Sequence, residues 1–216
     1  MKGLALVRNG SFKQAKSAFQ QSLQFAQQID HPRLMIDALT QLGILQMETE
    51  EVSKGISPLE KAYQAAQATK DRARQMQTAG LLANAFLRLE AHEKSLEYYK
   101  SALKNAQRTG NRHAEGVYHL QRGEVFLSRN EPDQAIEHFD QGLEIAQGLE
   151  NAALERSAYT LLMHAALQAG QLERGIECGK IALRLDAEAG DGLHRIQTAG
   201  TLATILILSL IHISEP

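Results

Sequence analysis

The sequence has 216 residues, with 23 Lys and Arg against 25 Asp and Glu, and a formal net charge of −2. This balance provides no general attraction for nucleic acid or anionic membranes, so neither partner class is expected. Apolar residues make up 44% of the chain, and a single cysteine, Cys178, excludes a disulfide within it.

Helices are predicted along the whole chain. Ala, Leu, Gln and Glu are abundant, Pro occurs four times and Trp is absent, which favours an all-α protein. Residues 1–8 are predicted to end a helix, and Asn9 and Gly10 to form a turn. Further helices are predicted at residues 32–48, 52–69, 72–89, 92–108, 112–129, 132–147, 152–169 and 172–188, and from 192 to about 206.

Turn signals separate these helices. They lie at residues 30–32, 109–111, 130–132, 169–170 and 190–192, where Gly, Pro, Asn and Asp gather. We expect Asn130 to cap the helix after it, because an Asn side chain accepts from free backbone N–H groups. Pro132 then fits the first turn of that helix, where its missing N–H has no partner to lose.

A spacing of 40 residues relates the helix pairs without insertion or deletion. Small residues recur at Ala15, Gly55, Ser95, Ala135 and Gly175, and at Ser22, Ala62, Ala102, Gly142 and Ala182. Between these two sets lie Phe19, Leu59, Tyr99, Phe139 and Gly179, and upstream lie Gly3, Gly43, Ala83, Gly123 and Met163. We expect each small residue to let two backbones approach and each large residue to fill the next gap. Because Gly179 and Met163 break the series, the fifth hairpin is expected to be looser or differently angled.

This pattern resembles the tetratricopeptide repeat, whose motif has Leu-Gly in the first helix, then small, aromatic and small residues in the second. Leu42 and Gly43 match the first part, and Ser95, Tyr99 and Ala102 match the second. The 40-residue period is similar to that of kinesin light chain, Pins-type adaptors and bacterial regulators. The resemblance implies an α-solenoid, a right-handed superhelix of about five antiparallel hairpins. Its units are residues 1–31, 32–71, 72–111, 112–151 and 152–191, with a partial unit at 192–206.

Both ends of the solenoid are expected to be truncated. Met1 falls in the middle of the first helix of unit one, and the repeat pattern stops near Leu206. Residues 208–216 resemble the translation of a sequencing-library adapter, so 207–216 is interpreted as a non-native tail; the alternative is an unusual apolar terminal helix. The apolar stretch at 202–213 is too short for an ordinary membrane span.

No catalytic constellation is present in the sequence. Glycines occur singly and not in a phosphate-binding loop, there is no Cys-x-x-Cys, and no histidine pair has metal-ligand spacing. His113 and His119 are interpreted as ordinary surface or helix-end residues, and Cys178 as a buried structural thiol. We therefore predict no enzyme, no cofactor and no metal.

The resemblance implies a concave groove lined by the first helix of each hairpin. Carried onto this chain, its lining positions are Asp37, Thr40, Ile44, Met47 and Glu48, then Gln77, Gly80, Asn84, Leu87 and Arg88, then Val117, Leu120, Glu124, Leu127 and Ser128, then Ser157, Thr160, His164, Leu167 and Gln168. The predicted partner-binding residues among them are Thr40, Ile44, Met47, Asn84, Leu87, Arg88, Leu120, Glu124, Leu127, His164, Leu167 and Gln168.

Two readings of this surface remain open. The apolar row Met47, Leu87, Leu127 and Leu167 can pack between adjacent helices or form a rail for a peptide. Asn84 and Arg88, one turn apart, can hold a peptide backbone or a carboxylate. The function expected is a cytoplasmic scaffold that binds a partner protein or peptide. The alternative is a sensory segment of a longer bacterial regulator, such as a transcription regulator or nucleotide cyclase.

Overall fold

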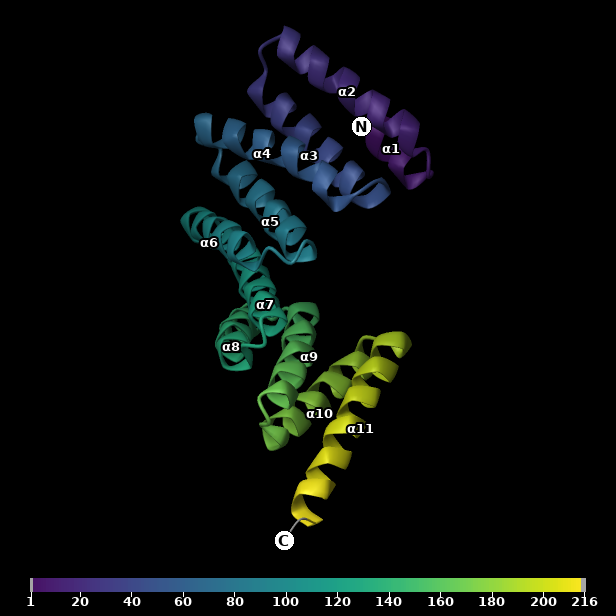
Figure 1. Ribbon diagram of the computed structural model, residues 1–216, viewed down its shortest axis with the longest axis vertical. Coiled ribbons are helices and arrows are strands. Elements are labelled where there is room, and N and C mark those ends of the chain that lie inside the picture. Colours follow the sequence, from purple (N-terminus) through teal and green to yellow (C-terminus); the bar gives the residue numbers. More distant parts are fainter. Residues whose placement is uncertain (1, 215–216) are drawn as a thin grey trace. The chain divides into compact units, whose positions relative to one another are not determined.

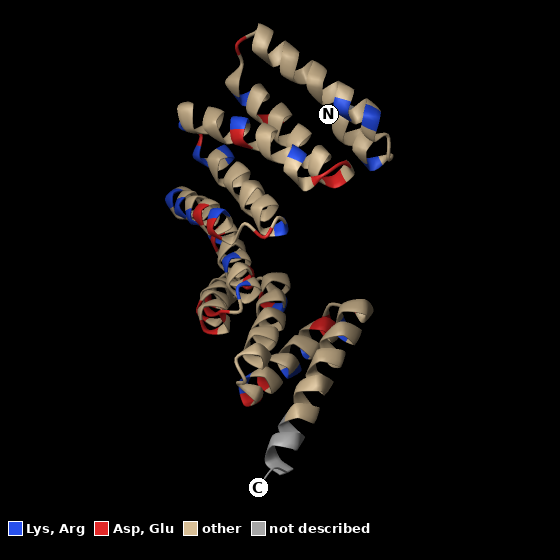
Figure 2. Ribbon diagram, in the orientation of Figure 1, with Lys and Arg blue, Asp and Glu red and all other residues tan. Residues whose placement is uncertain are grey.

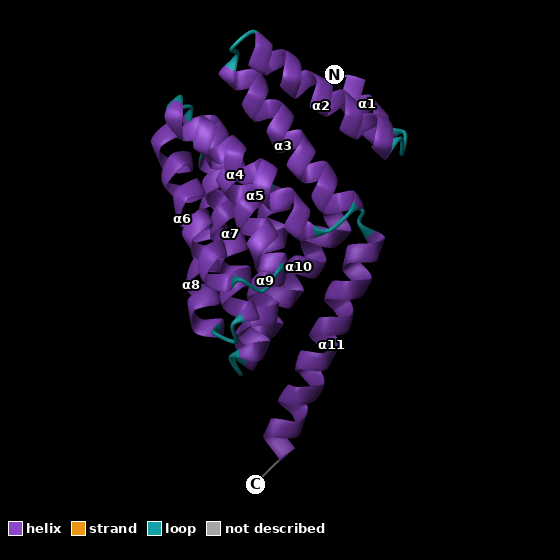
Figure 3. Cartoon of the chain, turned by 45° about the horizontal axis from the view of Figure 1, so that its top comes forward, coloured by secondary structure: helices purple, strands orange, loops and turns teal. Residues whose placement is uncertain are grey.

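The computed structural model describes the backbone of residues 2–214 and the side chains of residues 3–208. Every regular element in this part of the chain is an α-helix, and short turns join the eleven helices (Figures 1 and 3). They are α1 (Lys2–Arg8), α2 (Phe12–Gln28), α3 (Pro32–Thr49), α4 (Val52–Ala68), α5 (Arg72–Arg88), α6 (His92–Thr109), α7 (Arg112–Ser128), α8 (Pro132–Gly148), α9 (Ala152–Gln168), α10 (Leu172–Glu188) and α11 (Gly192–Ser214). The eight helices predicted between residues 32 and 188 are confirmed, with no boundary shifted by more than one residue.

The odd-numbered helices, called A helices below, share a type of side-chain cap at their N-termini. The residue before each A helix from α3 onward accepts a hydrogen bond from the backbone N–H three positions later, at 3.0–3.3 Å. The capping residues are His31, Asp71, Asn111, Asn151 and Asp191. The even-numbered B helices have no side-chain cap in the part of the chain that is described. Capping therefore follows the 40-residue period.

The expectation that Asn130 caps α8 is wrong. The N-cap residue is Glu131, which makes no side-chain cap bond, while Pro132 occupies the first turn as predicted. Asn130 instead adopts φ +60°, in the left-handed region. Asn tolerates this conformation better than most residues, so it serves the end of α7 and not the start of α8.

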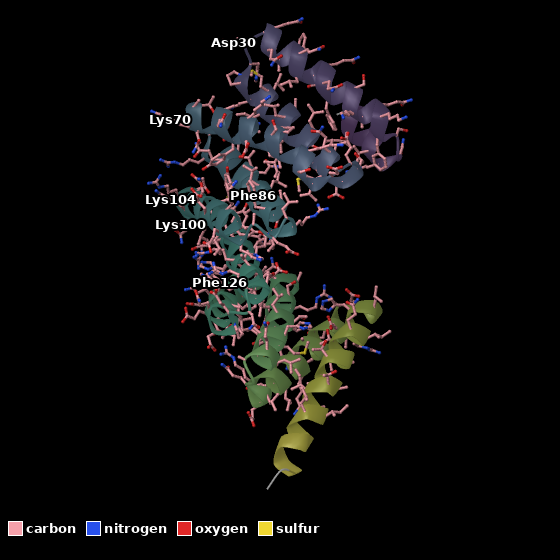
Figure 4. All side chains as sticks on the ribbon, viewed as in Figure 1. Asp30, Lys70, Phe86, Lys100, Lys104 and Phe126 are labelled. Carbon is pink, nitrogen blue, oxygen red and sulfur yellow. The ribbon has the colours of Figure 1, made fainter. Side chains whose placement is uncertain are left out.

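Left-handed residues end the helices at intervals of 20 residues. Gly occupies this place at positions 10, 110, 170 and 190, and Asp30, Lys70, Glu90, Asn130 and Glu150 occupy it elsewhere. Asp30 and Lys70 mark two of these turns in Figure 4. The end of α3 differs: Glu50 has φ −123°, and the helix runs one residue longer than α5.

The chain divides into two compact units, residues 1–110 with α1–α6 and residues 111–216 with α7–α11. Within each unit, every helix packs on its neighbours in sequence, and A helices also contact the next A helix, as α3 does α5 and α7 does α9. Positions of Lys and Arg and of Asp and Glu are scattered over the helices of both units (Figure 2). None of the helices formed by the described residues has the combined length and apolar character needed to cross a bilayer.

Close helix contacts depend on glycine in the A helix and a large residue in the B helix. A Cβ placed on Gly123 would lie 2.3 Å from Cε1 of Phe139, and one on Gly43 would lie 2.6 Å from Cγ of Leu59. Both large side chains are fully buried. The expected pairing of small and large residues is therefore present in these hairpins.

The fifth hairpin, α9 and α10, exchanges the two sizes. Met163 on the A helix is fully buried, and a Cβ on Gly179 of the B helix would lie 2.9 Å from its Sδ atom. The same Cβ would also lie 2.9 Å from Cδ1 of Leu202 on α11. The large residue now comes from α9, so the two helices still meet at a close contact between a small and a large residue. The expectation of a looser or differently angled hairpin stays a prediction.

Helix α11 continues past Leu206, where the repeat pattern stops, and ends at Ser214. Leu202 and Ile205 are buried, whereas Leu206, Ile207 and Leu208 are exposed. Residues 215 and 216 of the predicted non-native tail lie outside the described residues, as do the side chains of residues 209–214. The origin of that tail stays a prediction.

Candidate functional site

Two predicted groove residues of the first unit lie in its interior. Thr40 is 3% exposed, and its hydroxyl donates to the Ile36 carbonyl at 2.7 Å. Met47 is 8% exposed and packs in a core cluster with Leu59 and Phe86. Of the two readings of the apolar row, packing is the one that applies to Met47. Thr40, although largely buried, lines a pocket of about 640 Å³ together with the predicted lining positions Asp37 and Gln77.

Three other predicted residues of this unit reach its surface. Ile44 and Leu87 are half-buried on α3 and α5, and Arg88 is exposed at the end of α5. The Arg88 guanidinium lies 4.0 Å from the Glu48 carboxylate, with both side chains largely exposed. An exposed ion pair of this kind contributes little stability, so Arg88 can exchange Glu48 for another anion easily.

Asn84, predicted to act together with Arg88, is engaged within its own hairpin. The hydroxyl of Tyr99, which is fully buried on α6, donates to Oδ1 of Asn84. The amide oxygen is therefore occupied. What Asn84 offers to a ligand is the N–H donor side of its amide group.

In the second unit, the A helices form a pocket of about 390 Å³. Helix α7 supplies Val117, Leu120, Gln121 and Glu124, α9 supplies Leu154, Ser157, Thr160 and Leu161, and α11 supplies His194. The predicted partner-binding residues Leu120 and Glu124 lie here together, with the lining positions Val117, Ser157 and Thr160. Gln121, Leu154, Leu161 and His194 were missed, because they lie beside the positions that the family resemblance supplies.

The hydroxyl groups of the pocket bond to their own helix. Ser157 donates to the carbonyl of Ala153 and Thr160 to that of Arg156, each at 3.0 Å. The only hydrogen of each hydroxyl is thus committed, and the oxygen lone pairs remain for a ligand.

Two further polar groups of the pocket could each accept a hydrogen bond from a ligand. Oε1 of Gln121 is buried without a hydrogen-bond partner among the described residues. The Glu124 carboxylate is exposed at the pocket edge, yet surrounding protein removes part of its hydration and raises the pKa of Glu124. Since a hydrogen-bond donor would stabilise both groups, the pocket favours ligands that carry such donors.

His194 is held in the pocket by a buried network. Its Nδ1 lies 2.7 Å from Oδ1 of Asp186, a carboxylate that is fully buried. The Thr198 hydroxyl donates to the other oxygen at 2.9 Å, and the Arg156 guanidinium lies 3.6 Å from Oδ1. These partners offset the burial of the Asp186 charge.

A sequence signal for this network exists. At 40-residue spacing, Asp186 corresponds to Ala26, Ala66, Ala106 and Ala146, each of which is fully buried. A carboxylate where the earlier units have a buried alanine indicates a local network of partners, since an unpaired buried charge is strongly unfavourable.

The remaining predicted residues of this unit lie outside the pocket. Leu127 and Leu167 are half-buried, while His164 is exposed, and partial loss of hydration lowers the pKa of His164. Gln168 donates from Nε2 to Oδ1 of Asn130 at 2.6 Å. The structure therefore does not bring these four side chains to the site occupied by Leu120 and Glu124.

His119 differs from the expected surface histidine. It is 8% exposed, and its Nδ1 lies 3.3 Å from Nδ1 of His138, whose ring stacks on Phe126 at 5.3 Å between centroids. Burial, Arg122 and His119 lower the pKa of His138 to about 4. The pair is therefore neutral at pH 7, and one ring donates to the other.

Cys178 is a free, buried cysteine, as expected, and burial raises the pKa of its thiol. A thiol in this state is a poor nucleophile and packs as a small apolar residue. Within the described residues, no group of three or more His, Cys, Asp or Glu side chains has the arrangement of a metal site.

Comparison with known proteins supports the repeat interpretation. The family model described as tetratricopeptide repeat matches residues 74–148. No curated protein sequence matches the chain. The crystal structure of BtubC (BKLC) from P. vanneervenii is similar, with a TM-score of 0.78 and 19% identity over 90% of this chain and 82% of that one.

Two further solved structures share the fold. A signal transduction ATPase with numerous domains and a tetratricopeptide repeat sensor, from Pyrococcus horikoshii, has a TM-score of 0.85 and 16% identity over 95% of this chain. A Rap protein complexed with competence and sporulation factor has a TM-score of 0.74 and 14% identity over 96% of this chain. This chain spans 31% of the ATPase and 61% of the Rap protein. The sequence match over residues 74–148, the all-helical hairpins and these likenesses together support a tetratricopeptide repeat fold for this chain.

Proposed function

We propose that this chain is a scaffold that holds a segment of a partner protein against its A helices. The observation that carries the proposal is the pocket of the second unit, built by three successive A helices, α7, α9 and α11. Its lining combines apolar walls, such as Leu120 and Leu161, with a few directed polar groups, which is typical of ligand sites. Repeats of this family are in general non-catalytic interaction modules, so the proposal involves no reaction.

Site-specific photocrosslinking in cells tests this proposal. A photoreactive amino acid at Ser157, which is exposed at the pocket, should give a discrete adduct with a partner protein. The matched control is Glu144, exposed on the B helix α8 of the same unit, where no such adduct is expected. Equal labelling at both positions, or no labelling at Ser157, would contradict binding at the A-helix face.

In the first unit, we propose Ile44, Leu87 and Arg88 as further contact residues, because all three reach the surface of A helices. Leu87→Glu and Arg88→Glu should each weaken binding of the crosslinked partner while the circular dichroism spectrum stays unchanged. The control is Glu97→Gln, an exposed position on α6 whose side chain lies on a B helix. Parental affinity in both charged variants would remove this unit from the interface.

A second candidate is a cytoplasmic sensory or regulatory segment of a longer protein. It is favoured by the likeness to the ATPase whose repeats form a sensor, of which this chain spans 31%. Sequencing the gene on both sides of this segment tests the idea, which predicts an effector domain in the same reading frame. Stop codons directly beside the segment would argue against it.

A further inference from the structure

Apart from the amide nitrogen of Gln121, several polar atoms that line the second unit's pocket are acceptors. Ser157 and Thr160 have donated their hydroxyl hydrogens to backbone carbonyls, so only lone pairs face a ligand. Oε1 of Gln121 is an acceptor that is buried and unpaired within the described part of the chain. Glu124 adds a carboxylate that forms no ion pair with the described residues, and burial is the cause of its raised pKa.

His194 lines the same pocket. Its Nδ1 hydrogen is directed to the Asp186 carboxylate at 2.7 Å, since a carboxylate can only accept. Arg156 lies 3.6 Å from that carboxylate and shares in neutralising it.

This set of acceptor groups favours one class of ligand over the others. An anion would meet Glu124 and several lone pairs, which repel it. A purely apolar ligand would fill the walls formed by Leu120, Leu154 and Leu161, but would leave Oε1 of Gln121 unpaired. A ligand with several N–H donors and a positive charge satisfies the acceptors, and an apolar stem behind the charge suits the walls.

We propose that the pocket binds a basic side chain, that of lysine or arginine, from the partner protein. The head group donates to Gln121 and pairs with Glu124, while its methylene stem lies along the leucines. The inference rests on the proposed function, because the partner supplies the side chain. It adds the chemistry that the partner must present at this position.

Titration of the intact chain with blocked amino acids tests the cation. N-acetyl-lysine methylamide or its arginine counterpart should give saturable NMR shifts of the pocket amides. Blocked norleucine, which has a similar stem without the charge, should bind at least about tenfold more weakly, since one charge-assisted hydrogen bond is worth that factor. Equal binding of norleucine, tighter binding of blocked glutamate, or no binding by either cation would overturn the proposal.

Variants locate the cation within the pocket. Glu124→Gln, nearly isosteric, should weaken lysine binding about tenfold or more, and Gln121→Glu should strengthen it by adding a second carboxylate. Glu137→Gln, at an exposed position of α8 outside the pocket, is the matched control and should leave the affinity unchanged. Affinity that is insensitive to both pocket variants would place the cation elsewhere and overturn the assignment.

Two comparisons separate this inference from the proposed function. If Ser157 crosslinks to a partner equally well in the parent and in Glu124→Gln, and blocked lysine does not bind, the interface stands and the cation site falls. If blocked lysine binds but no protein crosslinks, the protein-binding function falls. Putrescine, a free diamine, is the third arm: if it binds more tightly than blocked lysine, a small amine and not a protein side chain is the ligand.

Discussion

At nine helix ends, a residue of the described chain adopts the left-handed region, with φ between 46° and 71°. Glycine reaches this region without strain, whereas a Cβ makes it unfavourable by about 1 kcal/mol or more. Five of the nine residues are not glycine. These positions therefore hold local strain that the packing of the hairpins overcomes.

Replacement of Lys70 by glycine should raise the free energy of unfolding by about 0.5 kcal/mol or more, because it relieves the strain at φ +55°. Gly110→Ala, at φ +66°, should lower it by about 1 kcal/mol. Urea denaturation monitored by circular dichroism measures both changes. A loss of stability in Lys70→Gly would show that its side chain makes a stabilising contact that outweighs the strain.

Acid should destabilise the protein through His138. In the folded chain burial, Arg122 and His119 lower its pKa to about 4, against about 6.5 in an unfolded chain. Between these values the unfolded state binds the extra proton, so stability is complete above pH 6.5 and decreases as the pH falls toward 4. The expected decrease is of the order of 2 kcal/mol. Urea titrations at several pH values should show a smaller decrease in His138→Gln, and equal decreases would remove His138 as the cause.

At the scale of the element, each hairpin is set by one small and one large residue that meet between its helices. Gly123 and Phe139 fill these roles in α7 and α8, and Met163 and Gly179 reverse them in α9 and α10. Each pair combines one small and one large residue, while the helix that supplies the large residue changes. Packing in these two hairpins thus requires a large residue opposite a small one, on either helix.

Gly123→Ala should destabilise the protein by about 1–3 kcal/mol, since its Cβ would lie 2.3 Å from the ring of Phe139. Gly148→Ala is the matched control: no atom lies within 4 Å of its Cβ, so helix propensity should leave stability unchanged or raise it by up to about 1 kcal/mol. The midpoints of thermal unfolding compare the two. Similar midpoints for both variants would mean that Phe139 moves aside at little cost.

At the scale of the molecule, helix contacts join near neighbours in sequence, in each of the two units. In such repeat architectures stability is close to a sum of local terms, because a hairpin contacts only the hairpins beside it. A destabilising substitution in one hairpin is then expected to act locally. It should open its neighbours more readily than distant helices.

Leu162→Ala removes a side chain that is 1% exposed in α9 and should lower local stability by about 2–5 kcal/mol. Hydrogen exchange followed by mass spectrometry should show faster exchange in α9 and α10 and in the helices beside them. Exchange in α3 and α4 of the first unit should keep its parental rate. An equal acceleration in all helices would indicate that the chain opens as a single cooperative body.

The sequence alone determined the helices, the 40-residue period and the small-large pairing. Helix ends depend on local chemistry, since Gly, Pro, Asn and Asp act within a few residues of their own position. The period repeats that chemistry, so Pro132 and Gly110 could be placed without coordinates. The role of Asn130 was predicted wrongly. An Asn residue suits both a helix cap and a left-handed turn, and only the backbone angles distinguish these two roles.

Only the tertiary structure decided the site. Leu120 and Glu124 were predicted from family positions, but Gln121 and His194 join them because α7 and α11 approach the same volume in space. Likewise, Met47 turned out to be core, since its exposure depends on which neighbours cover it and not on its place in the repeat. The local sequence pattern determines where each helix begins and ends. The atoms that meet across three helices depend on packing between residues far apart in sequence, and the sequence pattern does not specify those contacts.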